Sequence, residues 1–204
     1  MNKKVLVLAL VLVLAVTSVF AAKSDMKVGA QLGYGGRTVI ENAKDGDVYK
    51  LFNNGFYGAF TFEYGITDAI SVKAEAGINT MGTLIEKYND EDPEPWDSTP
   101  VNFTFFAGAF YNYAINKEIT VYGGAGFDML IGNFEKESTN KADVGFGLGL
   151  EAGASYKINK QISVNAGGKF AWHFVNTRNY NFYDSDSKIS QLTYKAYVGV
   201  TYSL

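Results

Sequence analysis

The sequence predicts an all-β protein, an eight-stranded antiparallel up-and-down transmembrane β-barrel that is preceded by a cleavable signal peptide. Three observations support this fold class: an export signal at the amino end, a hairpin turn that recurs along the chain, and a strand face without charges, amides or aliphatic hydroxyls. After Ala21 no apolar run is long enough for a transmembrane helix, so a chain that crosses a membrane here must cross it with strands.

The first 21 residues have the order of a secretory signal peptide. Lys3 and Lys4 precede an apolar run over residues 5–16, and small residues follow it up to Ala21, as in export signals. The run has 12 residues, fewer than the roughly 20 that a spanning helix needs. A retained N-terminal anchor is the alternative. We expect residues 1–21 to be the signal peptide and residues 22–204 to form one outer-membrane β-barrel domain.

The composition of the mature chain limits its partners. Removal of Lys3 and Lys4 leaves 16 basic and 21 acidic side chains, a net charge of −5. This acidic balance disfavours nucleic acids, whose phosphates need a basic face. The chain has no cysteine, so neither a disulfide nor a cysteine-linked lipid anchor is expected.

The strand count depends on a turn motif that occurs three times. The segment 64–72 recurs as 113–121 and as 156–164, each with the pattern Tyr-x-Ile, three polar or small residues, and then Ile-[Ser/Thr]-Val. Strand-forming residues on both sides of a short turn-prone insert indicate a hairpin. The chain ends supply two half copies, at 26–28 and 202–204. Three turns and two halves predict eight strands, with both termini at the short-turn end.

These turns fix the order of the elements along the chain. The eight strands are expected around residues 28–34, 56–64, 70–78, 101–113, 119–131, 144–156, 162–174 and 192–204. The long connections then lie at the opposite end of the barrel, over residues 38–54, 80–100, 132–143 and 176–190. An even number of strands with short turns at one end and long loops at the other is typical of transmembrane barrels.

The apolar face of the strands is expected to contact lipid. The alternation of side chains along each strand does not by itself show whether the apolar face points into or out of the barrel. The alternative is a soluble carrier barrel that turns this face inward. However, an eight-stranded barrel has room only for a filling of side chains, and this face carries too many aromatic rings. The opposite face is rich in Gly, Ser, Thr and Asn, a poor surface for water. An aromatic girdle at the short-turn end is expected from Tyr64, Tyr113, Tyr156 and Tyr202.

The inward face carries charges that the hairpin register places opposite one another. If the residues beside each short turn pair, Glu151 lies across from Lys169, and Glu63 lies across from Lys73. Charges in a narrow interior must be paired, which favours a plugged lumen, while a conducting or proton-linked lumen is the alternative. The inward glycines permit either tight curvature or water-sized cavities. The predicted lumen charge network consists of Glu63, Lys73, Glu75, Asp128, Glu151, Lys169 and Lys195.

From residue 26 to residue 204 the chain resembles the small eight-stranded outer-membrane barrels of the OmpX, OmpW and OmpA membrane-domain type. The most specific element is the ending Tyr197-x-Gly199-x-x-Tyr202-x-Leu204, which is similar to the C-terminal signal read by the barrel assembly machinery. That pattern usually has a polar residue in place of Tyr197 and Phe in place of Leu204. The charged interior is more similar to OmpX than to OmpW. The resemblance implies a monomer in the bacterial outer membrane, in contact with its lipids and, during insertion, with the assembly machinery.

No catalytic, metal or cofactor site is expected. Lipid A enzymes of the PagL group place Ser two residues after a lipid-facing His. Here the only histidine is His173, which the strand alternation places on the inward face, and the residue two positions after it is Val175 instead of Ser. The acidic run over residues 90–97 has carboxylates that suit Ca²⁺ but no regular ligand spacing, so it is interpreted as a solvated loop.

Three functions follow in order of preference. The first is a structural or surface-interaction barrel that acts through its extracellular loops on an unknown ligand or host surface. The second is a narrow, porin-like channel for small solutes. The third, a lipid-modifying enzyme, is disfavoured by the residues around His173, and the chain is predicted not to be an enzyme.

Overall fold

A computed structural model describes residues 25–42, 48–81, 84–88, 94–96, 101–132, 143–176 and 188–204. The elements within these ranges are strands: β1 (Asp25–Asn42), β2 (Val48–Gly65), β3 (Ile70–Met81), β4 (Leu84–Tyr88), β5 (Glu94–Trp96), β6 (Val101–Ala114), β7 (Ile119–Gly132), β8 (Asp143–Lys157), β9 (Ile162–Asn176) and β10 (Lys188–Ser203). In this part of the chain, no helix is long and apolar enough to cross a membrane.

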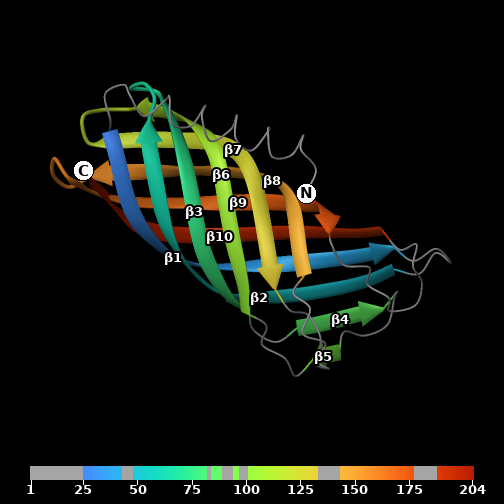
Figure 1. Cartoon of the computed structure of the whole chain (residues 1–204). Helices are drawn as coiled ribbons and strands as arrows, with labels where there is room; N and C mark the ends of the chain where they lie inside the picture. Colours follow the sequence, from blue (N-terminus) through green and yellow to red (C-terminus); the bar gives the residue numbers. More distant parts are fainter. Residues whose placement is uncertain are drawn as a thin grey trace, which may run out of the picture.

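Eight of the described strands form a closed antiparallel barrel (Figure 1). Their order around the wall is β1-β10-β9-β8-β7-β6-β3-β2, and a direct pairing of β1 with β2 closes the ring. Strands that are neighbours in this ring are also consecutive along the chain, except that β1 pairs with β10 and that β4 and β5 lie between β3 and β6 in the sequence. The predicted eight-stranded up-and-down barrel is therefore confirmed.

The three short turns have the same local structure. In the first, the Thr67 hydroxyl oxygen accepts hydrogen bonds from the backbone N–H groups of Ala69 (3.2 Å) and Ile70 (2.9 Å). Asn116 and Asn159 use their amide oxygens in the same way in the other two turns. A short side chain that bonds to the backbone two or three residues later stabilises a tight turn. The repeated turn fixes the predicted register, in which Glu63 pairs with Lys73 and Glu151 with Lys169.

The two faces of the wall have the predicted orientation. The outward residues Leu32, Phe60 and Phe127 are 70%, 78% and 76% exposed, while the inward side chains are largely buried. Tyr64, which is expected in the aromatic girdle, pairs with the outward residue Val72, and its side chain is 1% exposed.

The first predicted loop is mostly strand, which corrects the expected boundaries over residues 38–54. β1 and β2 stay paired from Thr38 opposite Phe52 to Asn42 opposite Val48, because β-branched residues such as Val39 and Ile40 favour continued pairing. The two strands run beyond the body of the barrel (Figure 1). The second predicted loop, over residues 80–100, contains β4, which pairs with the extension of β2, and β5, which pairs with β4.

Candidate functional site

Six charged side chains meet in the middle of the lumen, and we call them the central cluster. Three are acidic and three are basic, so their formal charges cancel. Their side chains are no more than 9% exposed. They come from five strands: Lys73 and Glu75 from β3, Asp128 from β7, Glu151 from β8, Lys169 from β9 and Lys195 from β10.

Glu75 is the hub of the central cluster. Its Oε1 lies 2.6 Å from Lys169 Nζ and 2.9 Å from Lys195 Nζ, and its Oε2 lies 3.8 Å from Lys73 Nζ. Glu151 is the second acceptor, because Lys73 donates to its Oε1 and Lys169 Nζ lies 3.7 Å from its Oε2. Each buried charge therefore has an opposite partner, as burial in a low-dielectric interior requires.

The ion pairs differ in part from those that the register suggested. Glu151 and Lys169 are close, at 3.7 Å. Glu63, however, pairs with Lys27 at 3.4 Å near the short-turn end, and Lys73 reaches Glu151 instead. The physical reason is the narrow lumen: the strands on the far wall are as accessible to a lysine as the adjacent strand is.

The hydrogen-bond network continues beyond the central cluster in both directions. Toward the loop end, His173 Nε2 lies 2.8 Å from Asp128 Oδ1, and both side chains are buried. Toward the turn end, the Tyr197 hydroxyl donates to Glu151 Oε1, and it is hydrogen-bonded to the Tyr122 hydroxyl at 2.9 Å. Sequence reasoning missed these contacts, although the inward phase of His173 and Tyr197 was a usable signal.

Aromatic rings pack against the lysines of the central cluster. Lys195 Nζ lies 3.5 Å from the Tyr57 ring centroid, and Lys169 Nζ lies 3.9 Å from the Phe106 ring centroid. An ammonium over a ring face within about 6 Å is attracted by the ring quadrupole. The rings therefore fill space and stabilise the buried cations at the same time.

Two inward glycines make room for aromatic rings inside the lumen. A Cβ at Gly149 would lie 3.1 Å from the Phe106 ring, and a Cβ at Gly153 would lie 2.5 Å from the Tyr122 hydroxyl. Glycine at both positions therefore permits the close approach of a ring. At these two positions a ring occupies the space that a water-sized cavity would need, while the role of the inward glycines in tight curvature stays a prediction.

A polar cavity of about 470 Å³ lies between the central cluster and the short turns. Hydroxyl, amide and charged side chains line it, and Lys73, Phe110 and Tyr122 form its inner end. The described lumen thus combines a polar vestibule at the turn end with a layer of ion pairs and rings.

The other residues singled out in the sequence lie outside this cluster. Tyr113, Tyr156 and Tyr202 are 60%, 47% and 40% exposed on the outward face near the short turns. In the C-terminal motif Tyr197 points inward and Leu204 outward, while a Cβ at Gly199 would meet the Asn165 amide oxygen at 2.6 Å. The acidic run over residues 90–97 lies mostly outside the described residues.

Within the described ranges, no group of three or more His, Asp or Glu side chains is arranged to hold a metal ion.

Comparisons with known proteins agree with this architecture. The family model described as outer membrane protein beta-barrel domain matches residues 6–184. No curated relative matches the sequence.

Three solved structures illustrate the likeness in fold. Neisserial surface protein A (NspA) is 14% identical with a TM-score of 0.60, covering 90% of this chain and 100% of that one. The outer membrane protein OprG from Pseudomonas aeruginosa is 13% identical with a TM-score of 0.59, covering 90% and 98%. The outer membrane protease OmpT from Escherichia coli is 9% identical with a TM-score of 0.53, covering 91% and 100%. At these identities the likeness concerns the fold alone.

Proposed function

The chain belongs to the outer membrane protein beta-barrel domain family, and from that premise we propose that it is a closed barrel of the bacterial outer membrane with a structural or surface-interaction role. The observation that carries the proposal is the central cluster, in which six mutually paired charges with side chains no more than 9% exposed cross the middle of the lumen. A selective pore needs charges that a permeating ion can reach. Here each charge is already bound to another side chain.

The interaction role is assigned to the loop end of the barrel. In a barrel that does not conduct, the surfaces left for recognition are the loops, which a rigid scaffold positions for binding. The extended β1–β2 pair and its neighbour β4 support this assignment, because they continue past the barrel wall at that end (Figure 1). The partner is proposed as a ligand or host surface outside the cell.

Liposome swelling tests the closed state. Vesicles that contain the refolded chain should swell in small sugars and amino acids no faster than protein-free vesicles. A wide porin serves as the positive control for solute entry. Swelling above the protein-free rate would contradict the proposal.

A narrow channel for small solutes is the second candidate, and the polar vestibule favours it. The vestibule already provides about 470 Å³ of polar space at the turn end, so only the layer of the central cluster separates it from the loop half of the lumen. In this case swelling would depend on solute size and would increase when Lys73 or Glu151 is replaced.

Export and insertion complete the proposal. Residues 1–21 are proposed as the cleaved signal peptide. The motif of Tyr197, Gly199, Tyr202 and Leu204 is proposed as the signal for the barrel assembly machinery. The inserted protein is proposed to be a monomer that acts without a cofactor and without enzymatic activity.

A further inference from the structure

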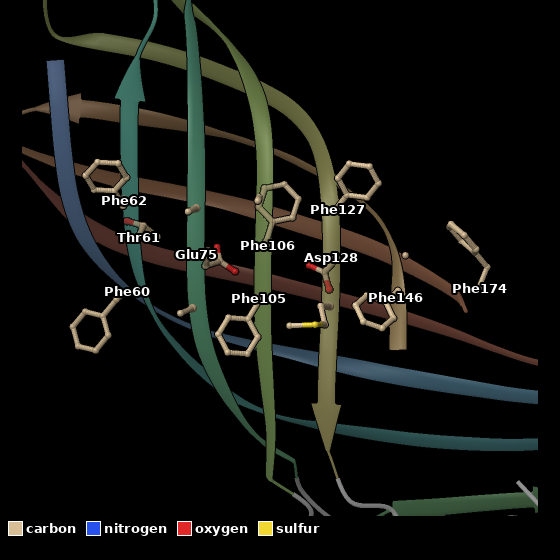
Figure 2. Close-up of a pocket in the computed structure, with 15 residues that line it drawn as sticks. Phe60, Thr61, Phe62, Glu75, Phe105, Phe106, Phe127, Asp128, Phe146 and Phe174 are labelled. Atoms are coloured by element: carbon tan, nitrogen blue, oxygen red, sulfur yellow. The ribbon is translucent and has the colours of Figure 1, made fainter. Parts of the chain in front are cut away.

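The polar vestibule differs in chemistry from the hollows on the outside of the barrel. The groove in Figure 2 lies on the lipid-facing side, where Phe60, Phe105 and Phe127 are exposed. The polar vestibule lies inside the lumen at the short-turn end and has a volume of about 470 Å³. Sites for small molecules usually have about 300–1,000 Å³, so the vestibule has room for one small polar ligand.

Charge is distributed unevenly around the polar vestibule. The side formed by β8, β9, β10 and β1, with the β8–β9 turn, contributes only basic charges, from Lys27, Lys157 and Lys160. The opposite side contributes charges of both signs, from Glu63, Asp68, Lys73, Lys117 and Glu118. Lys27 is bound to Glu63 at 3.4 Å, whereas within the described ranges Lys157 and Lys160 have no acidic partner. The β8–β9 side can therefore attract an anion.

Hydroxyl groups accompany these lysines on the same side of the polar vestibule. They belong to Ser155, Ser163, Thr201 and Ser203. The strand register places Ser163 between Lys157 on β8 and Thr201 on β10. A serine or threonine hydroxyl can donate one hydrogen bond and accept others. This side is therefore suited to a ligand that carries hydroxyl groups of its own as well as a negative charge.

Asn165 lies at the deep end of this side. It is 8% exposed, it lines the polar vestibule, and its Oδ1 has no hydrogen-bond partner, although buried polar atoms are nearly always hydrogen-bonded. Asn165 pairs with Ser155, two residues further in than the pair of Lys157 and Ser163, which is about 7 Å along the strand. A ligand that reaches from the lysines to this oxygen needs an anionic group at one end and a hydrogen-bond donor at the other.

We propose that the polar vestibule binds one small anionic sugar, of the sugar-phosphate class. The anionic group lies beside Lys157 and Lys160, and the sugar hydroxyls bond to Ser155 and Ser163. One further hydroxyl donates to Asn165 Oδ1. The short turns of outer-membrane barrels face the periplasm, so the ligand enters from that side without crossing the barrel. The site is therefore independent of the closed state of the lumen and of any interaction at the loop end.

Equilibrium dialysis tests the site on the refolded chain. The micelles consist of an uncharged polyether detergent, whose headgroup has neither a phosphate nor a sugar, and the probes are glucose-6-phosphate, glucose and inorganic phosphate. We expect one glucose-6-phosphate per chain, bound at least about fivefold more tightly than either other probe, since one exposed ion pair or one hydrogen bond accounts for a factor of about five. Equal affinity for inorganic phosphate or for glucose, or no binding of glucose-6-phosphate, would overturn the proposal.

The charged half of the site is tested by removing its lysines. The double change Lys157→Gln and Lys160→Gln should weaken binding of glucose-6-phosphate at least about fivefold. The matched control is the double change Lys50→Gln and Lys188→Gln, which removes the same charge at the loop end of β2 and β10 and should leave binding unchanged. An equal effect of the two double changes would show that the probe responds to net charge and does not occupy the vestibule.

The deep half of the site is tested at Asn165. Asn165→Leu has a similar size but no acceptor, so it should weaken binding of glucose-6-phosphate about fivefold and leave binding of inorganic phosphate unchanged. Ser155→Phe should block the vestibule, whereas Ala154→Phe places the same ring on the lipid-facing side of β8 and should have no effect. Heat-dependent mobility on gels identifies the variants that have folded. Undiminished binding in folded Asn165→Leu, or the same loss in Ala154→Phe as in Ser155→Phe, would overturn the proposal.

Discussion

Lys169 Nζ lies 2.6 Å from Glu75 Oε1, although the two residues belong to β9 and β3, which are not neighbours in the sheet. The ion pair therefore crosses the lumen, and Lys195 donates to the same oxygen from β10. The two partners are 2% and 0% exposed. The ion pairs that neutralise the buried charges are thus the same contacts that close the lumen. Variants of these residues therefore test both the charge pairing and the closure.

Replacement of Glu75 by Gln should lower the free energy of unfolding by about 3–5 kcal/mol, because it leaves buried lysines without their shared carboxylate. A urea titration of the chain refolded into lipid vesicles measures this change. The control is Glu63→Gln, since Glu63 and its partner Lys27 are partly exposed. That variant should cost under about 1 kcal/mol. Similar losses in the two variants would contradict the burial of the central cluster.

A double-mutant cycle should show that Lys73 and Glu151 act as a pair. Each single change, Lys73→Met or Glu151→Gln, should be strongly destabilising, and the double variant should recover part of the loss, with a coupling energy of about 1–3 kcal/mol. The same cycle on Lys73 and Glu63 should give a coupling near zero, because Glu63 is bound to Lys27. The reverse order of coupling energies would favour pairing between adjacent strands.

The contrast between these two cycles reflects what the sequence can predict. The turn motif and the period-two pattern predict strand number, face orientation and register, because each depends on neighbouring strands. The bond from Lys73 to Glu151 depends instead on the shape of the closed barrel and on side-chain reach across it. The strand extension beyond Thr38 was also missed, since polar residues such as Asn42 and Lys50 are typical of loops.

The lipid-facing wall should not tolerate charge at its centre. Leu150 and Val198 are 62% and 64% exposed on the outward face, and replacement of either by Arg should destabilise the barrel by about 2–4 kcal/mol if the site lies near the midplane. Ile158→Arg, in the β8–β9 turn, should cost about 0–1 kcal/mol, because the penalty falls toward the interface. The vesicle titration compares the three, and equal costs would show that the faces are assigned incorrectly.

The space above Gly149 should be needed for the Phe106 ring. Gly149→Val should destabilise the barrel by about 1–3 kcal/mol, the usual cost of overpacking, and Phe106→Leu in the same chain should reduce that cost. Gly123→Val is the matched control, because a Cβ there meets only the Glu151 carbonyl oxygen, at 3.9 Å. A larger loss for Gly123→Val than for Gly149→Val would mean that the ring does not occupy this position.

Single-channel recording in planar bilayers tests the closure of the lumen most directly. The refolded chain should give no current steps above the protein-free bilayer, because paired charges and rings occupy the middle of the barrel. Discrete currents from the parent chain, with an ion selectivity that changes in Lys169→Gln, would contradict this account and would support a water-filled channel.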